Sequence, residues 1–449
     1  MLDSMDSGGI QHELPITKPA PTGLAMQPRL PICQSTLPLD WYQEAFQPYA
    51  QEYLALPDQR PDTVLPWLNS YVEPALAHFG DELLLLAHFY MGGEIVKLVE
   101  RYGGAVADSY ALALQARANP QAKIIVESAV HFMAETIAIL ARDDQDVWIT
   151  NPKAGCTMEM MAKDWMVLPV VESLVEKHDL LVISYMNTSG RLKALAGRTG
   201  GAVCTSSNAH LVVDWARQQG RRILFLPDHH LGRNTAWRLG MDLDRVRALP
   251  DPRTLPADWQ PDDATLNDAE MILWGGFCGV HTVFSAEQVA WWQERGWTVL
   301  VHPESPLEVV KHADGSGSTA YLWKAITEAS PGSRIAIGTE GHFVRNAREH
   351  AATRNVQIEH LADIPGQAGT AGCGCATMSR NDPPHLAGML DLLRQGQPPE
   401  LNKVEAGDVI DEGTGTRTRL EASQRDALKG EATQALEQMI AITERKTNT

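Results

Sequence analysis

Cysteine is scarce in this sequence of 449 residues, and long apolar runs are missing. The six cysteines are scattered along the chain, which argues against a disulfide-stapled scaffold and suits a reducing cytoplasm. Apolar runs such as residues 83–87 are far too short to cross a bilayer, so we expect no membrane span. The first residues lack a basic stretch followed by an apolar one, so we also expect no signal peptide and a cytoplasmic protein.

Positive charge is also in deficit. Lysine and arginine total 38 against 56 for aspartate and glutamate, which gives a formal net charge of -18. Phosphate backbones and anionic lipid surfaces repel such a chain, which excludes nucleic acid and membrane as general partners. The apolar fraction of 44% and the charged fraction of 21% are typical of a globular protein, and the length allows two or three domains.

Strand-like and helix-like segments alternate through most of the chain. Short apolar runs such as residues 83–88 and 334–338 predict buried strands, and amphipathic segments between such runs predict helices. We expect a helix over residues 158–177 that is broken near Pro169, and a long polar loop over residues 241–268. This alternation predicts α/β domains with parallel sheets, whose active sites lie beyond the carboxyl ends of the strands.

Three cysteines stand beside glycines in different parts of the sequence. Cys156 and Cys375 each follow a glycine directly, and Cys278 follows the glycine pair at 275–276. Glycine lets the backbone approach a ligand closely, and the wide spacing is unlike a zinc ribbon. Three thiolates without a fourth suit a 4Fe–4S cluster with one open iron. The alternative is that the three cysteines are simply buried small apolar residues. By spacing alone, Cys373 could be the third ligand in place of Cys375.

Several polar side chains come just after predicted strands, at the sheet edge where active sites form. They are His88, Tyr90, Tyr185, Asn187, Ser206, His281, His302, Glu304 and Glu340. Each one alone is more simply explained as a structural residue or a helix cap. The run from Gly315 to Thr319 opens a predicted helix, where backbone N–H groups and the hydroxyls of Ser318 and Thr319 favour a phosphate or carboxylate.

Taken together, these segments resemble the quinolinate synthase family of de novo NAD synthesis. The matching motifs run in family order from about residue 83 to about residue 380. They are Ala-His-Phe-Tyr at 87–90, Ala-Asp-Ser-Tyr at 107–110, Phe-Met-Ala-Glu-Thr at 132–136, Ala-Gly-Cys at 154–156, Tyr-Met-Asn-Thr-Ser at 185–189, Cys-Thr-Ser-Ser-Asn-Ala at 204–209, Phe-Leu-Pro-Asp-His-His-Leu-Gly-Arg-Asn-Thr at 225–235, Gly-Phe-Cys-Gly-Val-His at 276–281, Val-His-Pro-Glu at 301–304, Gly-Ser-Thr at 317–319, Gly-Thr-Glu at 338–340 and Cys-Ala-Thr-Met at 375–378.

The resemblance implies an α/β fold of three similar three-layer αβα domains with parallel sheets around a pseudo-threefold axis, with the cluster and the active site at the centre. The implied domains are residues 66–150 together with about 375–396, residues 151–270, and residues 271–374. Outside them we expect an N-terminal extension, residues 1–65, that is partly mobile. Residues 397–449 are expected to form a C-terminal tail that ends in an amphipathic helix.

The resemblance also implies an activity and a set of residues for it. The reaction joins iminoaspartate to dihydroxyacetone phosphate and gives quinolinate, phosphate and water. Cys156, Cys278 and Cys375 match the ligands of a 4Fe–4S cluster whose open iron acts as a Lewis acid. The implied catalytic residues are Glu304 as general base and acid, His302, Tyr90 and Tyr185. The implied substrate-binding residues are His88, Ser109, Asn187, Ser206, His281, Ser318 and Thr319.

Two other functions are compatible with parts of the pattern. An iron–sulfur scaffold or redox sensor would need only the cysteines, and the intact His302 and Glu304 favour the enzyme. A zinc-dependent hydrolase built on His229 and His230 would lack the i, i+4 helical spacing of zinc proteases. The chain departs from the family at Ser305, where cysteine is frequent. Because iminoaspartate is labile in water, an L-aspartate oxidase or dehydrogenase is the partner expected to supply it.

Overall fold

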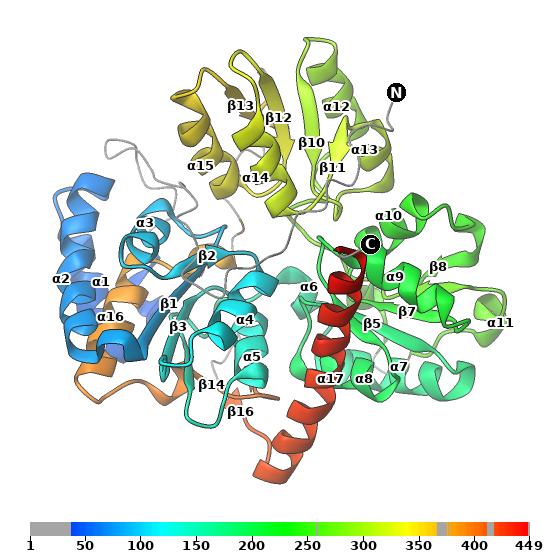
Figure 1. Cartoon of the computed structure of the whole chain (residues 1–449), viewed down its shortest axis with the longest axis horizontal. Helices are drawn as coiled ribbons and strands as arrows, with labels where there is room; N and C mark the ends of the chain where they lie inside the picture. Colours follow the sequence, from blue (N-terminus) through cyan, green and yellow to red (C-terminus); the bar gives the residue numbers. More distant parts are fainter. Residues whose placement is uncertain (1–36, 257–258, 366–374, 376, 411–416, 448–449) are drawn as a thin grey trace.

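The computed structural model describes residues 37–256, 259–365, 375, 377–410 and 417–447. Figure 1 shows three lobes around a common centre, and each lobe is a sheet flanked by helices. The protein is therefore α/β with largely parallel sheets, as the sequence predicted. No helix within the described ranges is both long enough and apolar enough to span a bilayer.

The first lobe contains a sheet in the strand order β14-β4-β3-β1-β2, in which β14 pairs antiparallel and the other strands pair parallel. Every residue of β1 is buried, as expected for a strand covered on both faces. The strands are β1 (Leu83–His88), β2 (Ala105–Ala107), β3 (Ile124–Ser128), β4 (Asp146–Ile149) and β14 (Lys403–Val404). The helices are α1 (Gln47–Leu54), α2 (Pro61–Phe79), α3 (Gly93–Arg101), α4 (Ser109–Ala118), α5 (His131–Leu140) and α16 (Pro383–Arg394).

The second lobe contains a parallel sheet in the order β6-β5-β7-β9-β8. Its strands are β5 (Leu181–Tyr185), β6 (Ala202–Cys204), β7 (Ile223–Leu226), β8 (Val246–Ala248) and β9 (Met271–Leu273). Its helices are α6 (Thr157–Met160), α7 (Asp164–His178), α8 (Gly190–Arg198), α9 (Ala209–Gln218), α10 (His229–Arg238) and α11 (Asp263–Leu266).

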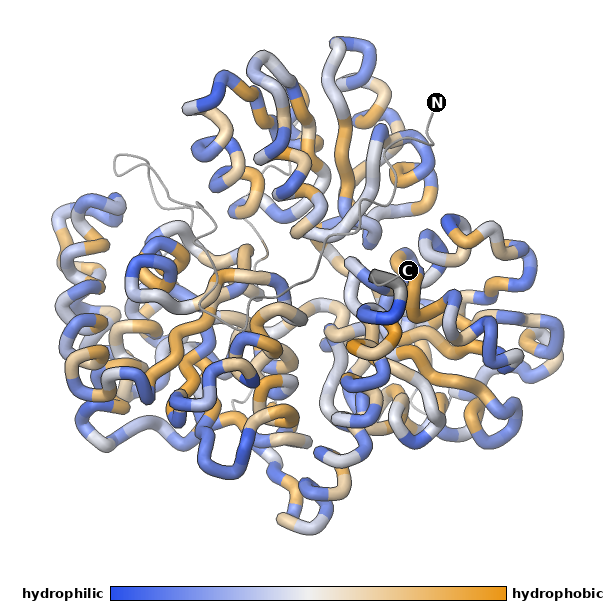
Figure 2. Tube along the Cα trace, in the orientation of Figure 1, coloured by the Kyte–Doolittle hydropathy of each residue, from blue (hydrophilic) through white to orange (hydrophobic). Residues whose placement is uncertain are grey.

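The third lobe contains a parallel sheet in the order β11-β10-β12-β13. Its strands are β10 (Thr298–Val301), β11 (Gly315–Ser316), β12 (Arg334–Gly338) and β13 (Gln357–His360). Its helices are α12 (Ala286–Gln293), α13 (Leu307–His312), α14 (Thr319–Glu328) and α15 (Gly341–Ala352). Figure 2 shows the apolar residues gathered on the strands inside the lobes, while polar residues cover the outer helix faces.

The three sheets share one connection pattern. The orders β2-β1-β3-β4, β6-β5-β7-β9 and β11-β10-β12-β13 are the same once strands are matched by position. In each lobe, the strand that comes first in the chain lies inside the sheet, with the second strand on one side of it and the third on the other. The fourth strand of the matched set pairs with the third. The loops that follow matched strands therefore lie at equivalent positions in the three lobes. A pseudo-threefold arrangement requires this repetition. The axis itself and the domain bounds stay predictions.

The C-terminal segment closes over the first and second lobes. Helix α17 (Ala422–Thr447) packs along α8, where a side chain at Gly197 would meet the carbonyl oxygen of Glu431 at 2.0 Å. The buried Glu135 of α5 accepts N–H groups from Gly190 at 2.7 Å and from Gly407 at 2.8 Å. One carboxylate thus joins α5, the start of α8 and the chain that leads to α17.

Two local expectations need correction. The predicted break near Pro169 is wrong, because Pro169 lies inside α7 and the break falls at residues 161–163, between α6 and α7. Pro169 is the sixth residue of α7, so its missing N–H removes one bond to the carbonyl four residues earlier without ending the helix. The predicted long loop at 241–268 instead contains β8 and α11, and β8 forms the edge of the second sheet.

Glu127 on β3 should make stability depend on pH. The side chain is fully buried, and neither carboxylate oxygen has a hydrogen-bond partner in the described part of the chain. Burial raises the pKa of Glu127 from 4.5 to about 8. Between these two values the unfolded chain releases a proton that the folded protein keeps, so stability falls as the pH rises through this window.

We therefore predict that Glu127→Gln stabilises the protein at pH 8, on the order of 4 kcal/mol from the shift alone, and has little effect at pH 5. Thermal unfolding midpoints of the variant and the wild type at both pH values test this. Glu176→Gln, which changes an exposed glutamate on α7, serves as the matched control. An unfolding midpoint with the same pH slope in the wild type and in Glu127→Gln would contradict the prediction.

Candidate active site

One cavity lies where the three lobes meet, and it collects the predicted catalytic, binding and ligand residues except Ser318; the sheet-edge candidate Glu340 does not line it either. It is lined by Cys156, Cys278, Cys375, Glu304, His302, His281, Tyr90, Tyr185, His88, Ser109, Asn187, Ser206 and Thr319, among others. Residues from far apart in the sequence therefore form one site. In this cavity a substrate could contact thiols, carboxylate, imidazoles and hydroxyls together.

The parallel sheets explain why these residues meet. His88 is the last residue of β1, Tyr185 is the last residue of β5, and His302 comes directly after β10. These three strands occupy matched positions in the three sheets. The carboxyl ends of parallel strands face one edge of a sheet, so each lobe presents a matched edge to the common cavity.

The three cysteines also follow matched strands. Cys156 comes after β4, Cys278 after β9 and Cys375 after β13, and each of these strands lies next to the third strand of its lobe. Cys373 and the glycine-rich run before it lie outside the described residues. The structure therefore shows only where Cys375 lies, and whether Cys373 could replace it as a ligand stays untested. Cys375 lines the cavity, and its Sγ lies 3.1 Å from the hydroxyl of Thr377.

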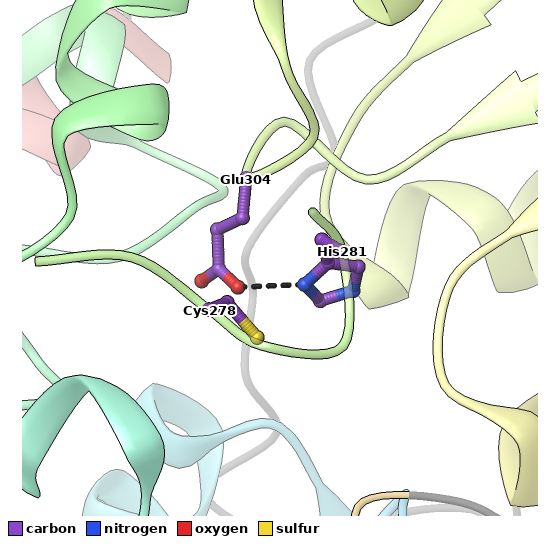
Figure 3. A group of neighbouring side chains, drawn as sticks. All are labelled: Cys278, His281 and Glu304. Carbon is purple, nitrogen blue, oxygen red and sulfur yellow. Dashed lines mark hydrogen bonds and ion pairs between the residues drawn. The ribbon is translucent and has the colours of Figure 1, made fainter. Parts of the chain in front are cut away.

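Glu304 is held at both carboxylate oxygens. The hydroxyl of Tyr185 donates to Oε1 at 2.6 Å, and His281 Nδ1 lies 2.8 Å from Oε2. Figure 3 shows the carboxylate facing the His281 ring, with the sulfur of Cys278 beside them. One ligand atom from each of Cys278, His281 and Glu304 lies within 4.8 Å of the others, and all three residues are buried.

The environment of Glu304 favours its ionised form. Burial alone would raise the pKa of this carboxyl, but the charge that the His302 ring carries in acid and the hydrogen bonds from His281 and Tyr185 outweigh burial and lower it to about 2. An ionised carboxylate only accepts hydrogen bonds, so the Nδ1–H of His281 and the O–H of Tyr185 are the donors. Glu304 is therefore an oriented proton acceptor at neutral pH.

Two histidines share one local geometry. The backbone N–H of Tyr90 donates to His88 Nδ1 at 3.2 Å, and that of Glu304 donates to His302 Nδ1 at 3.4 Å. Burial lowers the pKa of His88 to about 4, and burial together with His281 lowers that of His302 to about 3. Both rings are therefore neutral, and because Nδ1 accepts, each ring carries its proton on Nε2. The cavity thus has two neutral imidazole N–H donors.

A chain of hydroxyl contacts joins these groups across the lobes. His281 Nε2 lies 3.1 Å from the hydroxyl of Thr339, and the hydroxyl of Tyr90 lies 3.3 Å from those of Thr339 and Thr319. The polar path therefore runs from Tyr185 through Glu304, His281 and Thr339 to Tyr90. Burial raises the pKa of the Tyr90 hydroxyl well above its usual range, and Glu304 adds to this, so Tyr90 stays protonated.

Four further predicted residues lie at the N-terminus of a helix or beside a cysteine. Ser109 is the first residue of α4, and Thr319 is the first residue of α14, where helix N–H groups favour anions. The amide of Asn187 lies 3.9 Å from the sulfur of Cys156. Ser318 instead caps α14, because its hydroxyl accepts the N–H of Tyr321 at 3.3 Å. No lysine or arginine occurs among the described residues that line the cavity.

The three cavity thiols can ionise together only if positive charge lies near them. Burial raises the pKa of Cys156, and the nearby Cys375 raises it further. Burial, Glu304 and the other two cysteines raise the pKa of Cys278 in the same way. Thiolates can exist together here only if cations lie among them, and soft sulfur donors suit iron–sulfur clusters. His229 and His230 are not among the lining residues, which leaves the zinc hydrolase without support.

Three residues outside the predicted site set matter to the site: Thr339 and Asp228, which the sequence analysis names only within motifs, and Glu340, which it names only as a polar residue after a strand. Thr339 links His281 to Tyr90, and it is the middle residue of the Gly-Thr-Glu motif after β12. Asp228 and Glu340 cap helices and also bond to the backbones of cysteines. The signal available for all three was their place directly after a predicted strand.

Comparison with known proteins gives one consistent result. Residues 75–410 match the model of the family described as quinolinate synthetase A protein. A quinolinate synthase of Streptomyces coelicolor is 39% identical over 364 residues, which cover 80% of this chain and 88% of that protein. One from Staphylococcus carnosus is 36% identical over 365 residues, covering 80% of this chain and 95% of that protein. One from Acidobacterium capsulatum is 37% identical over 368 residues, covering 80% and 91%.

Proposed function

Because the chain belongs to the quinolinate synthase family of NAD biosynthesis, we propose that it condenses iminoaspartate with dihydroxyacetone phosphate. The products are quinolinate, inorganic phosphate and two waters, which balances the atoms of the two substrates. The observation that carries the proposal is the meeting of three thiols and an oriented Glu304 in one cavity between the lobes. A scaffold or sensor would need the thiols and would not need the polar chain around Glu304.

The family implies an iron–sulfur cofactor, and the residues of the cavity suit one. We propose that Cys156, Cys278 and Cys375 hold a 4Fe–4S cluster with one iron open to substrate. When bound, such a cluster supplies a Lewis acid that polarises substrate oxygen atoms before water leaves. The positive charge of its irons also offsets the mutual repulsion of the buried thiolates.

The protein groups around this position can hold and move protons. Glu304 is ionised, so it accepts a proton from a substrate carbon or hydroxyl and returns it to a leaving hydroxyl. Tyr185 and His281 keep the carboxylate in one orientation through hydrogen bonds of 2.6 and 2.8 Å. The neutral His88 and His302 donate from Nε2, which suits carboxylate and carbonyl oxygens of the substrates.

The substrates carry carboxylates and a phosphate, and the cavity meets them with neutral donors. Hydroxyls and amides of Ser109, Asn187, Ser206 and Thr319 lie along the wall. Neutral donors at helix N-termini bind anions without adding a fixed cation that would compete with the cluster for them. An L-aspartate oxidase or dehydrogenase is the proposed source of the labile iminoaspartate.

An anaerobic assay tests the proposal. Protein loaded with iron and sulfide should form quinolinate when it receives dihydroxyacetone phosphate together with iminoaspartate generated in place by an L-aspartate oxidase. Omitting either substrate should remove the product. Loaded protein that forms no quinolinate with both substrates present would contradict the proposed function.

Variants of the neighbours Ser318 and Thr319 should show different defects, one in stability and the other in substrate binding. Thr319 lines the cavity, so Thr319→Val should raise KM for dihydroxyacetone phosphate about tenfold or more, the loss expected for one hydrogen bond to a charged group. Ser318 caps α14, so Ser318→Ala should cost about 1 kcal/mol of stability and leave KM near the wild-type value. Steady-state kinetics and thermal unfolding of both variants measure this. An unchanged KM in Thr319→Val would assign the whole segment to helix capping.

A further inference from the structure

Two buried carboxylates each bind the backbone of a predicted ligand cysteine. Asp228, which is fully buried, caps α10 by accepting the N–H of Leu231 at 2.7 Å on Oδ1. Its other oxygen, Oδ2, accepts the N–H of Cys278 at 2.9 Å. The carboxylate therefore ties the cysteine to the first turn of a helix.

Glu340 repeats this arrangement in the third lobe. It is fully buried and caps α15, where Oε2 accepts the N–H of Phe343 at 2.9 Å. Oε1 accepts the N–H of Cys375 at 2.8 Å and also lies 2.9 Å from His342 Nδ1. The imidazole orients the oxygen that holds the cysteine, so Glu340 is itself fixed by a neighbour.

The two carboxylates occupy matched places in the fold. Asp228 follows β7 and Glu340 follows β12, which are matched strands, and each cysteine comes later in the chain than the strand paired beside that one. The matched helix of the first lobe is α5, and its N-cap residue is Val130, which has no side chain that can accept a hydrogen bond. There the N–H of His131 donates instead to the carbonyl of Ala154, two residues before Cys156. Two of the three cysteines are thus held by a carboxylate.

We propose that Asp228 and Glu340 are positioning residues that hold Cys278 and Cys375 in the geometry needed to retain the iron–sulfur group. This rests on the proposed cofactor and adds residues that lie outside its ligand set. A cysteine on a loop can turn away from a metal unless its backbone is fixed. Two hydrogen bonds to one buried side chain, one from the helix N–H and one from the cysteine N–H, fix the backbone of the cysteine against the helix. Groups that orient metal ligands change metal affinity by about 10–100-fold.

The test separates holding the cysteine from capping the helix. Serine is a good N-cap residue, so Asp228→Ser and Glu340→Ser keep an acceptor for the helix N–H. Serine has one oxygen and a shorter reach, so it cannot also hold the cysteine N–H. Asp228→Asn and Glu340→Gln are the second pair, because they keep the shape and weaken both bonds. Asp382→Asn is the matched control, since Asp382 is a buried N-cap of α16 that accepts the N–H of His385 at 3.2 Å and has no hydrogen bond to Cys156, Cys278 or Cys375 among the described residues.

The measurement is the rate of iron loss to a ferrous chelator from anaerobically loaded protein, read together with the thermal unfolding midpoint. We expect each of the four variants to lose iron about tenfold faster or more than the wild type. Asp382→Asn should lose iron at the wild-type rate even where its unfolding midpoint falls. Iron loss within twofold of the wild type in both serine variants would reduce Asp228 and Glu340 to helix caps and overturn the proposal.

The outcome does not depend on turnover. A wild type that retains iron but makes no quinolinate would contradict the proposed function, and the iron-loss rates would still decide the role of the two carboxylates. A second measurement is the visible circular dichroism of the loaded protein, which reports the asymmetry around the iron–sulfur group. It should change in Glu340→Ser and Asp228→Ser and stay unchanged in Asp382→Asn. Unchanged spectra together with unchanged iron loss would count against the proposal.

Discussion

Alanine at any one of Cys156, Cys278 and Cys375 is expected to leave the protein without its iron–sulfur cluster. Each thiol follows a strand of a different sheet, and the structure brings them to one cavity that contains no lysine or arginine among its described residues. Two remaining sulfurs cannot enclose a cluster that three hold. Burial would then favour their protonated forms, since it already raises the pKa of Cys156 and Cys278.

Iron and sulfide analysis after anaerobic purification measures this loss, and quinolinate formation should disappear with it. Cys204→Ala is the matched control, because Cys204 is fully buried on β6 and does not line the cavity. That variant should keep wild-type iron content. A near-full iron content in one of the three cavity variants would remove that cysteine from the ligand set.

The sequence predicted the architecture because the strands are buried on both faces. Such strands appear as short apolar runs, and every residue of β1 and β5 is buried. It also predicted most of the cavity wall, because parallel strands deliver the residues after them to one edge. His88, Tyr185 and His302 were recognisable for this reason. The resemblance to a family added the roles that position alone does not supply.

Other features depend on contacts that local sequence does not encode. Ser318 and Thr319 are neighbours with similar hydroxyls, yet one caps a helix and the other lines the cavity, since successive side chains point in different directions. Asp228 resembles any N-cap residue until the N–H of Cys278, fifty residues later, is found on its second oxygen. The docking of α17 on α8 depends on a close approach at Gly197, which periodicity does not reveal.

Glu304→Gln is expected to retain the cluster and lose turnover by about 10²-fold or more, the effect of removing a general acid–base group. Glutamine has the same shape and can still accept the hydroxyl of Tyr185, which lies 2.6 Å from Oε1 in the wild type. It cannot take a proton at neutral pH. The amide would also place an N–H₂ group toward either Tyr185 or His281, both of which donate to the carboxylate, so the oriented arrangement is weakened as well.

Single-turnover and steady-state kinetics on protein of measured iron content separate this loss from loss of the cluster. Glu308→Gln is the matched control, because Glu308 is an exposed glutamate on α13 that pairs with Lys311 at 3.0 Å and lies outside the cavity wall. It should keep the wild-type kcat. A Glu304→Gln protein with full iron content and a kcat within threefold of the wild type would assign the proton transfer to another group. In that case the neutral His302, whose ring lies beside Glu304 and carries its proton on Nε2, would be the first residue to test.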